Sequence, residues 1–273
     1  MRLRILTGIV ITLLIFVVAR RISRNRPAEL DLEFAGARVR HTSVYEQVGP
    51  GEPRIDLAID PAYAVEPSLV YRVGGAELLE TLPMERSGPL WTASLPSLER
   101  GRRIEYGFRL VPAGDESPAR PVTTRLFRIK YKGEVSPTVL VLHILCMFAS
   151  FFFIVESVLG AGAILARGEP KEFTVAMTRW VVLFSFLGGW PLGWVLNWQR
   201  FGVMWEGFPF GYDVTDNKTQ ILFLFWLVVV LLSWRSFFGR RQGRDPAPVR
   251  VYAWAVLVSA AVSLALFLVP HSL

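Results

Sequence analysis

The chain of 273 residues is 52% hydrophobic and 19% charged, whereas a soluble domain carries about 25% charged residues, so the composition predicts a membrane protein. One cysteine and three histidines exclude a disulfide framework and a cysteine-rich metal site, and no cofactor is predicted. The basic residues behind the net charge of +7 flank the apolar segments, which is typical of membrane topology signals, so no nucleic-acid partner is expected.

Residues 1–26 contain an apolar run from Ile5 to Ala19 with arginines on both sides. Such a run is either the core of a cleaved signal peptide or a short membrane anchor. Arginines directly after Ala19 disfavour cleavage. The sequence therefore favours an uncleaved N-terminal signal anchor with an Arg-rich flank.

Residues 27–133 have a different sequence pattern, in which apolar and polar residues alternate. Turn residues separate five alternating stretches, which predict strands over 54–60, 68–73, 90–95, 104–111 and 124–131. Short strands at this spacing over about 100 residues are typical of an antiparallel β-sandwich.

Two segments of this region resemble the later strands of an immunoglobulin-like or fibronectin type III-like domain. They are Trp91-Thr-Ala-Ser-Leu-Pro96 and Gly101-Arg-Arg-Ile-Glu-Tyr-Gly-Phe108. The resemblance implies a sandwich fold whose role is to bind or to space other groups. The cysteine pair of antibody domains is absent.

Residues 134–273 contain four further apolar segments, at 138–166, 180–198, 219–234 and 251–270. Each is long enough to cross a bilayer, if the helix tilts or its flanking residues reach the surface. With the anchor, the sequence predicts five transmembrane helices. The predicted fold class is mixed: an antiparallel β-sandwich external domain plus an α-helical transmembrane domain.

The charges of the connecting loops predict the orientation. The connection from Trp234 to Val251 carries five arginines, whereas residues 197–220 carry two basic and three acidic residues. The positive-inside rule places the first connection in the cytoplasm and the second outside. Alternation then places the N-terminus in the cytoplasm and the β-domain outside the inner membrane of a prokaryote, with the arginines of residues 20–26 as a local exception.

The external loop 199–219 is unusually rich in aromatic residues and glycine. It follows tryptophans at 190, 194 and 198, whose spacing predicts one shared helix face. Exposed aromatic surface usually marks a contact site, and the predicted interaction residues are Trp205, Glu206, Phe208, Phe210, Asp213 and Asp216. The run from Trp205 to Thr219 also resembles a segment of uncharacterised bacterial multi-pass membrane proteins, which implies no activity.

Oxygen atoms of Asp213, Thr215, Asp216 and Asn217 are possible ligands for Ca²⁺ or Mg²⁺. The spacing lacks the glycine and the distal glutamate of an EF-hand loop. We favour the simpler interpretation that Thr215 or Asp216 caps the following helix.

Glu156 lies among apolar residues of the second predicted helix, where inserting a carboxylate costs about 2.5–3.5 kcal/mol. It therefore needs a partner, and Arg179 is the nearest basic residue in depth. An intramembrane Glu156–Arg179 pair, or a protonated Glu156 hydrogen-bonded to a neighbour, is the favoured interpretation, and a proton or ion path is the alternative.

His143 and His271 lie at the outer ends of predicted helices and leave ligation of haem or a chlorin open. Transmembrane cytochromes usually place their ligand histidines well inside facing helices. A hydrogen-bonded histidine at the interface is therefore favoured over a cofactor ligand.

The sequence carries none of the motifs G-x-S-x-G, H-E-x-x-H and G-x-x-x-x-G-K, so no enzyme is predicted. The leading hypothesis is a non-catalytic accessory or assembly subunit of a larger bacterial inner-membrane complex. Its β-sandwich and aromatic loop dock against other membrane proteins within the lipid bilayer. The alternative is a membrane redox component that binds haem or a chlorin, or a transport component, using His143, Glu156 and the outer acidic loop.

Overall fold

The computed structural model describes residues 2–22, 27–60, 62–112, 122–240 and 244–269. The chain divides into two compact units. The helical unit comprises Met1–Arg24, Val135–Trp198 and Val203–Leu273, and the β-unit comprises Asn25–Glu134 with Gln199–Gly202.

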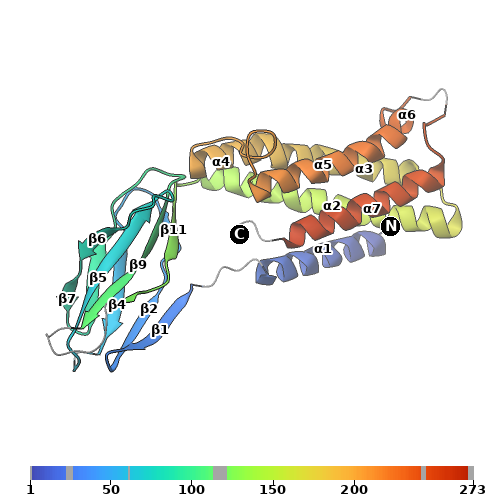
Figure 1. Cartoon of the computed structure of the whole chain (residues 1–273). Coiled ribbons are helices and arrows are strands. Elements are labelled where there is room, and N and C mark those ends of the chain that lie inside the picture. The colour runs from blue at the N-terminus through green and yellow to red at the C-terminus, as the bar shows by residue number, and fades with distance from the viewer. Residues whose placement is uncertain (1, 23–26, 61, 113–121, 241–243, 270–273) are drawn as a thin grey trace. The chain divides into compact units, whose positions relative to one another are not determined.

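The β-unit contains two sheets (Figure 1). The first is antiparallel, in the order β1 (Glu29–Phe34), β2 (Ala37–Thr42), β4 (Arg54–Ile59), β8 (Leu90–Ser94) and β7 (Glu85–Ser87). The second has the order β3 (Glu46–Val48), β11 (Phe127–Lys132), β9 (Arg103–Pro112), β5 (Val65–Val73) and β6 (Glu80–Pro83), and β10 (Val122–Thr123) also pairs with β9.

One strand departs from the predicted antiparallel pairing. The edge strand β3 runs parallel to β11, so the second sheet is mixed. At three residues β3 is too short to carry a periodic pattern. An ion pair of 2.6 Å between Lys132 and Glu46 joins the two strands.

Alternation along the strands builds one hydrophobic core from both sheets. Every second residue of β2 and of β11 is buried, because successive side chains of a strand point to opposite faces. His41 is a buried polar residue whose ring packs against Tyr106, Phe108 and Phe127 of this core. Its Nδ1 donates to the Asp56 carbonyl at 2.7 Å and its Nε2 accepts from the Tyr106 hydroxyl at 2.9 Å. Burial lowers the pKa of His41, which favours the neutral imidazole that this arrangement requires.

The helical unit contains α1 (Arg2–Ile22), α2 (Pro137–Arg167), α3 (Glu172–Leu187), the π-helical turn η1 (Gly188–Leu192), α4 (Gly193–Phe201), α5 (Val214–Leu232), α6 (Trp234–Phe237) and α7 (Val249–Leu268). Within the described residues, four segments are long and apolar enough to cross a membrane: 137–167, 172–201, 214–232 and 249–268. The apolar stretch of α1, Ile5–Ala19, is shorter.

The third membrane helix begins earlier than predicted. Residues 172–179 were expected in a loop, yet they form the first two turns of α3. Thr174 and Thr178 are buried there, and the Thr178 hydroxyl lies 3.1 Å from the Tyr252 hydroxyl of α7. The charges of Glu172 and Arg179 kept these two turns out of the predicted apolar segment.

Candidate functional site

The aromatic loop is shorter than predicted, because α4 continues to Phe201 and α5 begins at Val214. Three of the four aromatic rings in the remaining segment, residues 202–213, are exposed. Phe208 is 62% exposed, Phe210 83% and Tyr212 91%. This aromatic loop is therefore the main candidate for contact with another molecule.

Asp216, in the first turn of α5, holds the backbone of the loop. Its side chain is buried, with one carboxylate oxygen accepting from the Glu206 amide at 2.7 Å and the other from Asn197 Nδ2 at 2.9 Å. One buried carboxylate thus ties the end of α4, the loop and the start of α5 together.

Asp213 is the N-cap of α5, rather than Thr215 or Asp216 as predicted. Its Oδ1 accepts from the Thr215 and Asp216 amides at 2.8 and 3.0 Å, which satisfies two N–H groups that the helix itself leaves unpaired. The Asp213 amide in turn donates to the Glu206 carbonyl at 2.9 Å. Asp213 therefore caps the helix with its side chain and closes the loop with its backbone amide.

Asn217 adds a third brace, because its Oδ1 accepts from the Phe208 amide at 2.7 Å. The oxygens of Asp213, Asp216 and Asn217 thus face N–H donors. Among the described residues no group of three or more His, Cys, Asp or Glu side chains is arranged to hold a metal ion. Burial, followed by the nearby charges of Asp213 and Asp216, raises the pKa of Glu206.

Trp205 packs on an aromatic ring of the π turn. It is half-buried and stacks on Trp190 with ring centroids 6.3 Å apart, while Trp190 meets Phe223 edge-on at 4.6 Å. The predicted shared face of the tryptophans at 190, 194 and 198 assumes constant helical spacing. The π turn that contains Trp190 interrupts that spacing. Gly207 leaves room for this packing, because a Cβ there would lie 2.8 Å from the Trp205 ring.

The predicted Glu156–Arg179 pair does not form. Arg179 Nη2 donates to the Ser236 carbonyl at 2.6 Å and its Nε to the Phe237 carbonyl at 2.7 Å. Glu156 is buried against α1 instead, where a Cβ on Gly8 would lie 2.4 Å from Glu156 Oε1. The pair fails because similar depth in the membrane does not place two side chains on facing helix surfaces.

The histidine considered as a cofactor ligand is tied to the backbone. His143 Nδ1 donates to the Gly188 carbonyl at 2.9 Å, at the start of the π turn. His271 lies outside the described residues.

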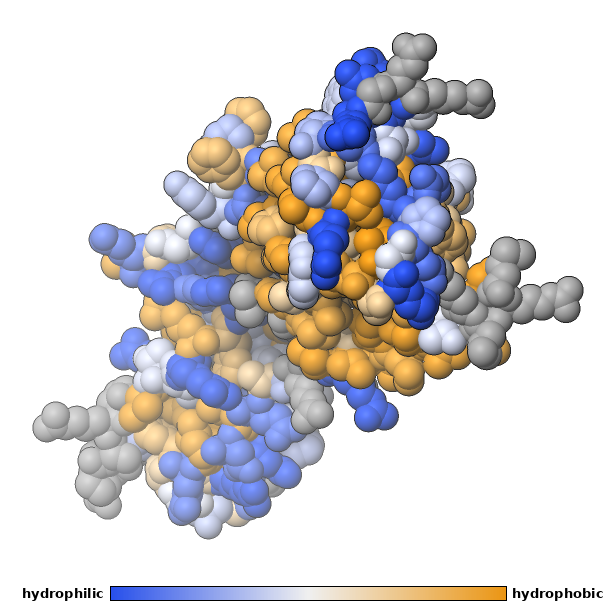
Figure 2. Space-filling view, turned by 90° about the vertical axis from the view of Figure 1, so that its right-hand side faces the viewer, coloured by the Kyte–Doolittle hydropathy of each residue, from blue (hydrophilic) through white to orange (hydrophobic). Residues whose placement is uncertain are grey.

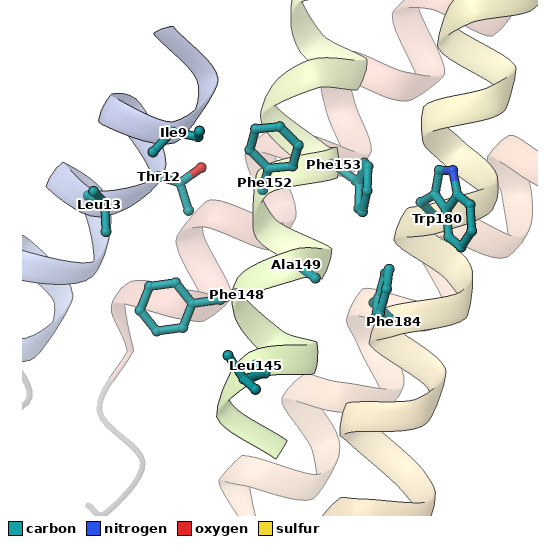
Figure 3. Close-up of a pocket in the computed structure, with 10 residues that line it drawn as sticks. All are labelled: Ile9, Thr12, Leu13, Leu145, Phe148, Ala149, Phe152, Phe153, Trp180 and Phe184. Atoms are coloured by element: carbon teal, nitrogen blue, oxygen red, sulfur yellow. The ribbon is translucent and has the colours of Figure 1, made fainter. Parts of the chain in front are cut away.

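An open apolar groove of about 540 Å³ lies between α1, α2 and α3. Figure 3 shows Ile9, Thr12 and Leu13 on one side of it and Trp180 and Phe184 on the other. The Thr12 hydroxyl donates to the Gly8 carbonyl at 2.8 Å within α1. The groove therefore presents hydrocarbon surface, which suits acyl chains.

Two site residues did not emerge from the sequence. Asn197 braces the aromatic loop through Asp216, and Asp245 holds α6 by accepting from the Ser236 amide at 2.9 Å. Asn217 emerged only as a possible metal ligand, whereas its Oδ1 accepts from the Phe208 amide. A usable signal existed for Asp245, which is the only acid between Trp234 and Val251. A lone acid among arginines has an obvious use as an ion-pair partner.

Comparison with known proteins adds little to this site. No protein-family model and no curated protein matches the chain. A solved structure described as "Crystal structure of Br derivative BhCBM56" is similar to 37% of this chain and 97% of its own, with 14% identity and a TM-score of 0.25. At that TM-score the similarity supports no conclusion about function.

Proposed function

We propose that this protein is a non-catalytic accessory or assembly subunit of a larger bacterial inner-membrane complex, and that the aromatic loop docks against another membrane protein. The exposure of Phe208, Phe210 and Tyr212 on a braced backbone carries this proposal. A loop already fixed by Asp216 loses little conformational entropy on binding. Aromatic side chains are also frequent energetic anchors of interfaces.

The β-unit is proposed as the second docking surface, with an immunoglobulin-like or fibronectin type III-like sandwich fold. Its two sheets around one core support that assignment. In the same proposal α1 is an uncleaved anchor and the fifth membrane helix, and the β-unit lies outside the inner membrane.

Replacing Phe210 by alanine is expected to weaken association with the partner about thirtyfold, corresponding to about 2 kcal/mol for an interface anchor. Native gels and mass spectrometry of complexes extracted in mild detergent measure it. Trp254→Ala is the matched control, because this ring is 59% exposed on α7, away from the loop. A lone monomer in every preparation would contradict the proposal, and a haem or chlorin absorbance band would favour the redox alternative.

Reporter fusions at Gly211 and Gly239 are expected to lie on opposite sides of the membrane, with Gly211 outside, because only α5 separates them as a long apolar helix. The arginines of the α5–α7 connection favour the cytoplasm for Gly239. Gly114 and Gly243, two further fusion points that the sequence suggests, lie outside the described residues. If the reporter at Gly239 lies outside, the orientation of the protein is the reverse of the one proposed.

A further inference from the structure

The connection between α5 and α7 contains a short helix, α6. Helix α5 ends at Leu232, and its C-cap residue Ser233 donates from its hydroxyl to the Val229 carbonyl at 2.8 Å. The four-residue helix α6 follows at once, and the Phe237 amide donates to the Ser233 carbonyl at 2.7 Å. A short helix thus follows the apolar segment after a single residue.

Charged side chains connect α6 to α3 in two places. Asp245, whose side chain is only 2% exposed, accepts from the Ser236 amide at 2.9 Å and pairs with Lys171. Arg179 of α3 donates to the carbonyls of Ser236 and Phe237. Side chains of Arg179 and Asp245 therefore hold the backbone of α6 in place.

Two aromatic rings and two arginines are exposed in α6 and in the segment that follows it. Trp234 and Phe238 are exposed, with ring centroids 4.5 Å apart. Arg240 and Arg244 are exposed as well, and within the described residues no acidic side chain forms an ion pair with either. Figure 2 views the helical unit from this end and shows hydrophilic residues gathered among hydrophobic ones.

Aromatic rings beside arginines at the end of an apolar helix match the boundary between hydrocarbon and lipid headgroups. Guanidinium groups bind phosphate oxygens in a two-pronged geometry. We propose that the α6 surface, defined by Trp234, Phe238, Arg240 and Arg244, binds the headgroup phosphate of an anionic phospholipid. The aromatic pair points to a lipid rather than free phosphate, because rings at this boundary contact the lipid itself.

The test uses the full chain in lipid nanodiscs that contain phosphatidylglycerol or phosphatidylcholine, with native mass spectrometry counting retained lipid. A basic residue near an anionic membrane surface contributes about fivefold to the binding constant, so Arg240→Gln with Arg244→Gln is expected to weaken phosphatidylglycerol retention about 25-fold. Retention of phosphatidylcholine is expected to be weak throughout. Higher salt is expected to reduce the preference.

The matched control is Arg40→Gln with Arg109→Gln, which removes the same charge from exposed positions of the β-unit. The control is expected to retain phosphatidylglycerol like the unaltered protein, and unchanged melting temperatures show that both variants are folded. Equal retention of the two lipids, an equal loss in the control, or full displacement by millimolar inorganic phosphate would overturn the proposal.

Discussion

Replacing Asp216 by alanine is expected to lower the free energy of unfolding of the helical unit by about 3 kcal/mol and to release the aromatic loop. The buried carboxylate accepts from Glu206 and Asn197, and hydrogen bonds to a charged group contribute about 1.5–3 kcal/mol each. Alanine leaves both donors without this acceptor. Thermal unfolding in detergent measures the loss of stability.

Hydrogen exchange separates release of the loop from general unfolding. The Glu206 amide is expected to exchange faster in Asp216→Ala, whereas the Phe208 amide keeps its acceptor on Asn217 and changes less. Asp213→Asn is the matched control, because asparagine caps a helix about as well as aspartate, so it is expected to cost only a few tenths of a kcal/mol. Equal effects of the two substitutions would show that Asp216 does not brace the loop.

The strands show which elements an alternating pattern of apolar and polar residues can predict. The five predicted stretches correspond to β4, β5, β8, β9 and β11, which supply much of the shared core. Four of the unpredicted strands have two to four residues, too few for an alternating pattern. By contrast, β1 carried a usable signal, because Leu30, Leu32 and Phe34 alternate with acidic residues.

The site depended on contacts that no local pattern encodes. An acidic residue at the start of α5 suggested a cap, but the choice of Asp213 follows from where the loop closes on Glu206. For Arg179 the sequence indicated depth alone, while its direction toward α6 is a property of how α3 packs. Exposure of Phe210 and Tyr212, in contrast, was foreseeable, because a short loop rich in glycine and aromatic residues cannot bury every ring.

Replacing Asp245 by alanine is expected to have the largest effect, a loss of about 3–5 kcal/mol, because removing one partner of a buried ion pair leaves the other charge uncompensated. The loss is expected to free α6, since the Ser236 amide and hydroxyl both donate to Asp245. Thermal unfolding of the full chain in detergent measures the stability, and exchange of the Ser236 amide reports on α6.

A double-mutant cycle with Lys171→Met attributes the effect to the pair. The double variant is expected to lose less than the sum of the single losses, because the second substitution removes the charge that the first left unpaired. Additive losses would show that Lys171 and Asp245 act independently.

The pH dependence supplies an independent check on Asp245. Burial alone would raise its pKa, but hydrogen bonds from Lys171 and Ser236 outweigh burial and hold this pKa at about 2, below its ordinary value of 3.8. A lowered carboxyl pKa means that the unfolded chain binds the proton more readily, so this contribution is complete above about pH 4 and is lost as the pH falls toward 2. The unaltered protein is therefore expected to lose more stability than Asp245→Ala over that interval. Parallel pH profiles of the two proteins would contradict the assignment.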